Sequence, residues 1–269
     1  MARFPGDARL NIIVTNDDGL HTPGIWHLAQ ALTDLGNVTV VAPDREQSGV
    51  GMGITFHNPV RISEAMSRIP GVKAYMVEGT PADSVILAVQ AVPPLPVDLV
   101  VSGINEGANT GHNVLVSGTV GAAFQAHFWD IPSIAVSVAG IRDWRFDVAA
   151  KAAQTLARMF KDKTLAGPMV LNVNVPNIPM GDIEGVSVTR LAKGRFTDTL
   201  QRVDSFKQDA FYFWLARGKA EWTEEPDTDI WAIKNKRISI SPLHIDLSAD
   251  VTSPLLAEFA PSIFRAIKP

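Results

Sequence analysis

The 269-residue sequence contains no cysteine. This absence excludes a disulfide framework, a thiolate zinc site, an iron–sulfur cluster and a cysteine nucleophile. The sequence also lacks any apolar run near the roughly 20 residues that a membrane helix needs. Its first residues, Met1 to Arg9, lack the hydrophobic core of a signal peptide. We therefore expect a cytoplasmic protein that does not insert into a membrane.

Charge is scarce as well, because Asp, Glu, Lys and Arg together make up 19% of the residues and the net charge is −4. A mildly acidic chain is a poor candidate for non-specific binding to a nucleic-acid polymer or a membrane surface. Hydrophobic residues reach 46%, which is enough to bury a large core and excludes general disorder. At ~150 residues per domain, the length indicates one or two domains.

Several catalytic signatures are missing. The sequence has no G-x-S-x-G nucleophile elbow and no H-E-x-x-H zinc motif, so a serine hydrolase and a zinc protease are not expected. The lysine of a nucleotide-binding P-loop is missing too. Among the histidines, only His112 lies in a loop with other candidate site residues, and we keep it as a candidate acid or base.

What is present is an alternation of short β-branched runs with amphipathic helical stretches. Such an alternation predicts right-handed βαβ units, and hence an α/β fold with a mostly parallel sheet and helices on both faces. The predicted strands are 11–15, 38–42, 98–102, 133–138 and 169–173, and the predicted helices are 23–35, 82–91, 119–129 and 146–160.

The pattern changes near Gly181. Strands are predicted at 186–191, 211–215 and 237–241 without intervening helices, and 221–229 is predicted to be a loop. We therefore expect residues 1–180 to form the catalytic core and 181–269 a β-rich extension that is not an independent domain. The extension includes the aromatic cluster Phe211–Trp214, which would be an aggregation hazard unless a partner subunit covered it.

Ligands of open parallel sheets bind at the carboxyl ends of the strands, so the loops 16–22, 43–53 and 103–118 are the candidate site. The first loop places Asp17 beside Asp18 directly after a strand. Like charges this close destabilise each other, and a divalent cation with its preference for oxygen ligands would relieve them. The alternative is that one aspartate caps the following helix or forms an Asx turn.

The other two loops are rich in glycine. Three glycines within 49–53 can form a lip that approaches a ligand closely, or simply a mobile solvent loop. The third loop ends in Ser117, Gly118 and Thr119 at a predicted helix start, where backbone N–H groups can hold an anion. An ordinary capped loop is the alternative there.

Taken together, these loops resemble the SurE family of survival proteins, which are metal-dependent nucleoside monophosphate phosphatases. The resemblance spans nearly the whole chain. It rests on T-N-D-D-G and H-T-P-G-I (15–25), A-P-D-R-E-Q-S-G (42–49), E-G-T-P-A-D (78–83), S-G-I-N-E-G-A-N-T-G (102–111), S-G-T-V-G-A-A (117–123), I-P-S-I-A-V-S (131–137), N-V-N-V-P (172–176) and the late T-D-I-W-A-I and S-I-S-P-L-H-I-D-L.

The resemblance implies a Rossmann-like core and hydrolysis of nucleoside 5′-monophosphates, linked to stationary-phase survival. It implies one divalent cation per subunit, such as Mg²⁺ or Mn²⁺, held by Asp17, Asp18, Ser48 and Asn105, with Asp17 and Asp18 also catalytic. It further implies a dimer or tetramer whose extension exchanges elements between subunits. The candidate phosphate-binding and substrate-binding residues are Asn16, Gly49, Asn109, Ser117, Gly118 and Thr119.

Some positions depart from the family pattern. Glu46 stands where Asn is frequent, His112 and Asn113 replace an acidic residue, Val116 replaces Tyr, and Lys236-Arg237 replaces Gly-Tyr. None is a metal position, so these departures bear on substrate preference and rate. The sequence leaves 3′-monophosphates and short polyphosphate open as substrates, and water is preferred over aspartate as the nucleophile.

Two other functions are considered. A haloacid-dehalogenase-like phosphatase with Asp17 as nucleophile would need D-x-D spacing, whereas these aspartates are adjacent. A catalytically weak nucleotide-binding stress-response protein would share the fold but would not turn over substrate.

Overall fold

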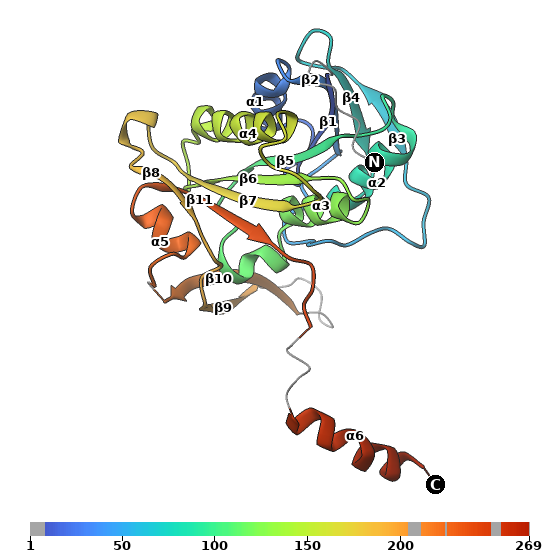
Figure 1. The fold of residues 1–269 in the computed structure, drawn as a ribbon, viewed down its shortest axis with the longest axis vertical. Coiled ribbons are helices and arrows are strands. Elements are labelled where there is room, and N and C mark those ends of the chain that lie inside the picture. The colour runs from blue at the N-terminus through green and yellow to red at the C-terminus, as the bar shows by residue number, and fades with distance from the viewer. Residues whose placement is uncertain (1–8, 204–210, 224, 249–253, 269) are drawn as a thin grey trace.

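A computed structural model describes residues 9–203, 211–223, 225–248 and 254–268 (Figure 1). Its centre is a nine-stranded sheet in the order β3-β4-β2-β1-β5-β6-β7-β11-β8. The pairings are parallel except for β3 with β4 and β7 with β11. The strands are β1 (Leu10–Thr15), β2 (Gly36–Pro43), β3 (Ile62–Ala65), β4 (Lys73–Val77), β5 (Leu99–Glu106), β6 (Ser133–Ala139), β7 (Val170–Pro176), β8 (Gly185–Val188) and β11 (Arg237–Leu243).

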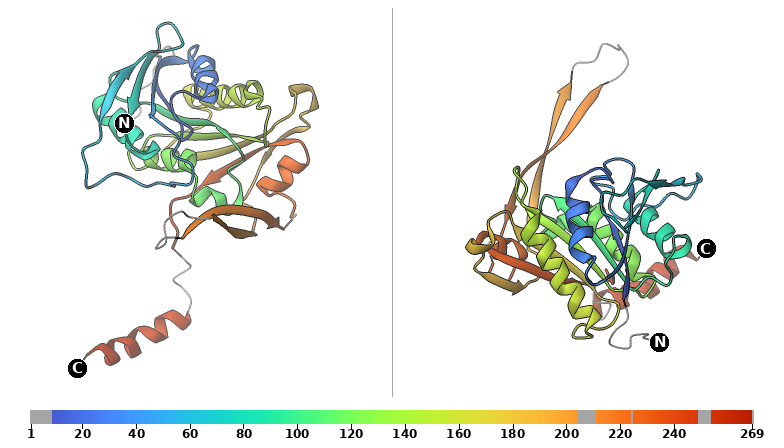
Figure 2. Two further views of the ribbon diagram at one scale, coloured as in Figure 1. Left: turned by 180° about the vertical axis from the view of Figure 1, so that it is seen from behind. Right: turned by 90° about the horizontal axis from the view of Figure 1, so that it is seen from above.

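Helices cover both faces of this sheet, as predicted. α1 (Pro23–Leu32) and α4 (Phe146–Lys161) pack together on one face, and α2 (Pro81–Ala91) and α3 (Gly118–His127) pack on the other (Figure 2). Successive side chains of β1 point to opposite faces. Accordingly, Ile12 and Val14 join the core under α1 and α4, while Ile13 joins the core under α2 and α3. A strand buried on both faces must be apolar throughout, which is why β1 could be predicted from its sequence.

Four details differ from the sequence prediction. β3 and β4 were not expected because both are short: β3, the edge strand, has no buried side chain, and β4, which lies between β3 and β2, has a run of only four apolar residues. β5 runs on to Glu106, so Asn105 and Glu106 lie on a strand that pairs with β6 beyond an irregularity at 103–104. The loop after β5 is correspondingly short and leads into the 3₁₀ helix η1 (Gly111–Leu115).

The fourth difference concerns the region after Gly181, where we expected strands without intervening helices and predicted neither the strand Gly194–Val203 nor the helix Pro254–Ile267. The short helix α5 (Asp229–Lys234) precedes β11, and the Thr228 hydroxyl caps it by accepting from the Trp231 N–H at 3.3 Å. A second short 3₁₀ helix, η2 (Met180–Asp182), precedes β8. One capped turn is too short for hydrophobic periodicity to reveal, although T-D at its start is an N-cap signature.

The extension combines three kinds of element. β8 and β11 extend the main sheet, and β9 (Gly194–Val203) pairs with β10 (Tyr212–Trp222) in a separate antiparallel ribbon. The ribbon projects from the body in the right view of Figure 2. The helix α6 (Pro254–Ile267) lies apart from the sheet and its covering helices (Figure 1). Within the described residues, no helix combines the length and the apolar character that crossing a bilayer requires.

Candidate functional site

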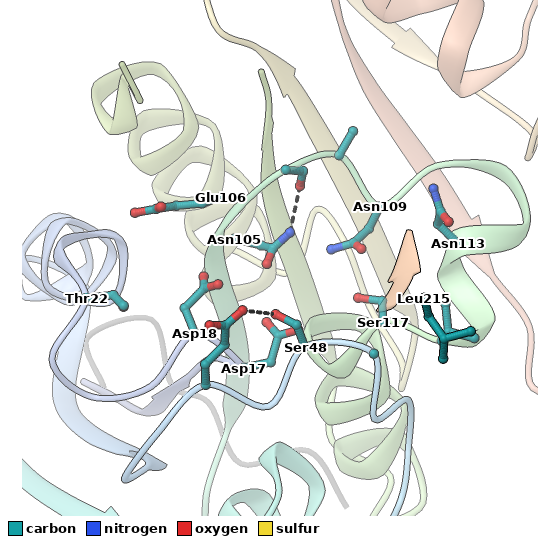
Figure 3. Close-up of a pocket in the computed structure, with 15 residues that line it drawn as sticks. Asp17, Asp18, Thr22, Ser48, Asn105, Glu106, Asn109, Asn113, Ser117 and Leu215 are labelled. Carbon is teal, nitrogen blue, oxygen red and sulfur yellow. Dashed lines mark hydrogen bonds between the residues drawn. The ribbon is translucent and has the colours of Figure 1, made fainter. Parts of the chain in front are cut away.

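A cavity of about 630 Å³ opens at the carboxyl ends of β1, β2 and β5, where the three predicted loops meet (Figure 3). Its size is within the range of small-molecule sites. The residues that line it are Asp17, Asp18, Thr22, Glu46, Ser48, Gly49, Asn105, Glu106, Gly107, Ala108, Asn109, Asn113, Val116, Ser117 and Leu215.

Asp17 is buried at the base of the cavity, with 3% of its surface exposed. Thr119 Oγ1 donates a 2.6 Å hydrogen bond to Asp17 Oδ1. Burial raises the pKa of Asp17 above its ordinary 3.8, while this bond and the backbone amides at the start of α3 act in the opposite direction. Gly118 allows that approach, since a Cβ there would lie 2.7 Å from the Cβ of Asp17. The hydrogen-bond donors at the start of α3 thus stabilise the charged form of the Asp17 carboxylate.

Asp18 is held less firmly. Burial, together with the negative charges of Asp17, Glu106 and Glu46, raises its pKa from the ordinary 3.8 to about 7. Its Oδ2 is buried without a hydrogen-bond partner among the residues that the structure describes. A buried carboxylate oxygen without a partner is costly unless it is protonated or binds a cation.

Two neutral side chains with oxygen atoms, Asn105 and Ser48, face this pair. Asn105 Nδ2 donates to the Gly107 carbonyl at 2.7 Å, which orients the amide so that its Oδ1 faces the aspartates (Figure 3). The Ser48 hydroxyl donates to Glu46 Oε1 at 2.9 Å and lies on the same side of the cavity as Asp17. In the described part of the chain, no three His, Cys, Asp or Glu side chains form a metal-binding group. The four residues therefore fit a hard cation, which prefers oxygen ligands, rather than a site rich in nitrogen or sulfur.

The predicted substrate-binding residues fall into two groups. Gly49, Asn109 and Ser117 line the cavity, whereas Asn16, Gly118 and Thr119 lie behind it. The Asn16 amide is used within its own loop: Nδ2 donates to Gly19 O at 3.1 Å and Thr22 Oγ1 at 3.0 Å, and Oδ1 accepts from Gly19 N at 3.1 Å. Asn16 thus holds the loop that presents the aspartates. Gly19 completes the turn with a φ of +94°, which favours glycine.

Asn109 is held by a buried polar network. Its backbone N–H donates to Asn174 Oδ1 at 2.8 Å, and its carbonyl accepts from Asn172 and Asn174 at 2.8 and 3.0 Å. Its side chain donates to Ser137 Oγ at 2.9 Å and to Thr119 Oγ1 at 3.3 Å. Thr119 therefore connects Asn109 to Asp17. Sequence reasoning included the two β7 asparagines in a motif without giving them a role, although two polar residues alternating on a buried strand signal such a network.

The extension is tied to the same loop through Asp229, which is fully buried. Its Oδ2 accepts from Gly111 N at 2.7 Å, and its Oδ1 accepts from Ala192 N at 2.9 Å. Sequence reasoning missed this connection because Gly111 and Asp229 are 118 residues apart.

Other lining residues were not proposed for the site from the sequence. Glu106 and Thr22 belong to this group, and so do Glu46, Asn113 and Val116, which had appeared only as departures from a family pattern. The expectation for His112 was wrong. Its side chain is exposed on η1 and is not among the cavity residues, so it is not placed to act as an acid or base there.

Known proteins resemble this chain in sequence and in fold. The family described as "Survival protein SurE" matches residues 12–198, which include Asp17, Asp18, Ser48 and Asn105. A relative named 5′-nucleotidase SurE from Moorella thermoacetica is 44% identical over 238 residues, covering 88% of this chain and 91% of the relative. A protein of the same name from Dehalococcoides mccartyi is 43% identical over 237 residues, covering 87% and 89%. The crystal structure of the SurE protein from Aquifex aeolicus has a TM-score of 0.74 and 34% identity, and the match covers 95% of this chain and 99% of that one. The chain therefore belongs to the SurE family.

Proposed function

We propose that this protein is a 5′-nucleotidase that hydrolyses nucleoside 5′-monophosphates to nucleoside and phosphate with one divalent cation per subunit. The observation that carries the proposal is the meeting of Asp17, Asp18, Ser48 and Asn105 around one side of the cavity (Figure 3). The names of the relatives, 5′-nucleotidase SurE, support the same activity.

The charges of the cavity explain why a cation is needed. A phosphate dianion would be repelled by Asp17, Asp18, Glu46 and Glu106, which all line the cavity. A bound divalent cation would screen this repulsion, polarise the phosphorus and lower the pKa of water. Asp17 and Asp18 would hold the cation through carboxylate oxygens, and Ser48 and Asn105 through neutral ones.

The two carboxylates differ in their freedom to move a proton. Asp17 is fixed by Thr119, whereas Asp18 Oδ2 is buried without a hydrogen-bond partner among the described residues. Asp18 is therefore better placed to accept the proton that water loses as its oxygen bonds to phosphorus and the P–O bond to the nucleoside breaks. Of the candidate phosphate ligands, Ser117, Asn109 and Gly49 are the three on the cavity wall.

We also propose a homo-oligomer, a dimer or tetramer, formed through the extension beyond Gly181. In the ribbon, Phe211 and Trp214 are 69% and 68% exposed, and their neighbours Tyr212 and Phe213 are each half exposed. On α6, Phe259, Ile263, Phe264 and Ile267 are exposed in the same way. Contiguous apolar surface of this extent marks an interface between proteins.

The activity is tested by measuring phosphate release from a panel of 5′- and 3′-monophosphates and short polyphosphate, with and without Mg²⁺ or Mn²⁺. We expect turnover of 5′-monophosphates only with added metal. Nucleotide binding without turnover would instead favour a catalytically weak nucleotide-binding protein. Our expectation of a cytoplasmic location stays a prediction, which cell fractionation would test.

A further inference from the structure

The cavity has two chemically different ends. In Figure 3, Asp17, Asp18 and Glu106 lie at one end and Asn113 and Leu215 at the other, and Val116, which directly precedes Ser117 in the sequence, also lines the cavity. Figure 3 shows Leu215 beyond Ser117, on the side away from the aspartates. Among the described lining residues, this second end has no ionisable side chain. A ligand whose anionic group faces the aspartates and their cation therefore presents its opposite end to uncharged side chains.

Leu215 is one of several large apolar side chains that are mostly exposed. It lies on β10 of the ribbon, is 82% exposed and is the one described ribbon residue in the cavity lining. Val116, beside it in the lining, is 37% exposed, and its carbonyl is fixed by accepting from Gly51 N at 3.0 Å. Two aliphatic side chains at the edge of a polar cavity leave apolar surface in water unless a ligand or a partner subunit covers it.

Building on the proposed function, we propose that Leu215, together with Val116, forms the wall that contacts the nucleobase and so determines specificity for nucleotides over smaller phosphate esters. A nucleobase is an uncharged ring with apolar faces, which matches an aliphatic wall. Aliphatic side chains form no hydrogen bonds that could distinguish one base from another, so this wall accepts purines and pyrimidines. The larger face of a purine buries more apolar surface against it. The extension thereby completes the substrate site of the core.

The test compares 5′-AMP with ribose 5-phosphate, which has the same phosphate ester and sugar but no base. Leu215→Ala removes about 50 Å² of apolar contact and should lower the ratio of kcat/KM for 5′-AMP to that for ribose 5-phosphate about tenfold, mainly through KM. Leu215→Met keeps a long apolar side chain and should retain most of the ratio. Leu200→Ala is the matched control, since Leu200 pairs with Leu215 in the ribbon and is 66% exposed but lies outside the cavity lining.

The outcomes separate the two proposals. If the wild type releases phosphate from neither compound, the proposed function falls, and this inference falls with it. If the wild type is active and Leu215→Ala changes both compounds equally or neither, the nucleotidase stands and the base wall is wrong. Light scattering on each variant gives the assembly state. A change of mass in Leu215→Ala with an unchanged substrate ratio would assign Leu215 to a subunit contact and overturn the inference.

Discussion

Thr119 Oγ1 donates a 2.6 Å hydrogen bond to Asp17 Oδ1 across 102 residues of sequence. The same hydroxyl accepts from Asn109 Nδ2 at 3.3 Å, so one side chain joins the aspartate loop to the loop after β5. The sequence suggested that Thr119 binds the phosphate, whereas its hydroxyl forms hydrogen bonds with Asn109 and Asp17. We infer that Thr119 acts through the position and charge of Asp17.

The first prediction follows from this contact. Thr119→Val keeps the shape of the side chain but removes the hydroxyl, so it should raise the metal concentration for half-maximal activity by ~10–100-fold, the usual effect of losing a partner of a metal ligand. Thr119→Ser retains the hydroxyl and should stay close to wild type. A metal titration of phosphatase activity measures both. If Thr119→Val leaves the metal concentration for half-maximal activity unchanged and raises only KM for the nucleotide, Thr119 binds the phosphate instead.

The second prediction concerns pH and the stability of chelator-treated protein. Because burial and neighbouring carboxylates raise the pKa of Asp18 from 3.8 to about 7, the folded state holds a proton that the unfolded state has already lost between these values. The contribution of Asp18 to the free energy of unfolding should therefore be largest below pH 4, fall as pH rises towards 7, and level off above it. Asp18→Asn should make the decrease in the free energy of unfolding between pH 4 and pH 7 smaller by roughly 2–4 kcal/mol.

Denaturant unfolding from pH 4 to 8 with chelator present tests this expectation. Glu64→Gln, which removes a carboxylate from an exposed position on β3, is the control and should leave the slope unchanged. A slope that is the same in Asp18→Asn and in the wild type would show that Asp18 does not carry the effect.

The third prediction compares two buried asparagines on one strand. Asn174 both accepts from Asn109 N and donates to Asn109 O, whereas Asn172 only donates to that carbonyl. Asn174→Ala leaves the Asn109 N–H without its partner and should cost about 1–3 kcal/mol more stability than Asn172→Ala. Urea unfolding of the two variants, each compared with wild type, measures the difference. Equal costs would contradict the role given to the Asn174 acceptor.

The fourth prediction addresses assembly. Phe264→Asp places a charge on the exposed apolar face of α6, where Phe264 is 65% exposed, and should reduce the molecular mass in solution. Ser262→Asp, on the same helix and exposed, should leave the mass unchanged. Light scattering at micromolar concentration measures the molecular mass of the wild type and of both variants. A monomer mass for the wild type would refute the proposed oligomer altogether.

The core of the fold could be predicted from the sequence because its strands are buried on both faces, and each strand therefore appears in the sequence as a run of apolar residues. Ile12 to Val14 in β1 shows this, since all three side chains are buried. β3 and β4 at the sheet edge and the short α5 lack such a signal. β4 is fixed by pairing with β2, more than 30 residues earlier, and α5 is too short for its local N-cap at Thr228 to reveal a helix.

The site could be predicted only in part, for a similar reason. Polar residues directly after buried strands marked Asp17 and Asp18, and the structure brings them together with Ser48 and Asn105. The hydrogen-bond partner of a hydroxyl or an amide depends on how the loops fold, as Thr119 and Asn16 show. Leu215 reaches the cavity because of the path of the ribbon, which local sequence does not encode.

The central claim is that a divalent cation held at Asp17 and Asp18 is required for phosphate release, and one measurement tests it most directly. Phosphate release from 5′-AMP is followed in wild type and Asp17→Asn after exhaustive chelation and again after adding Mg²⁺ or Mn²⁺. We predict that chelation abolishes wild-type activity, that metal restores it, and that Asp17→Asn remains folded but is slower than wild type by orders of magnitude once metal is added. Full wild-type activity without metal, or an Asp17→Asn rate equal to that of wild type, would contradict the account.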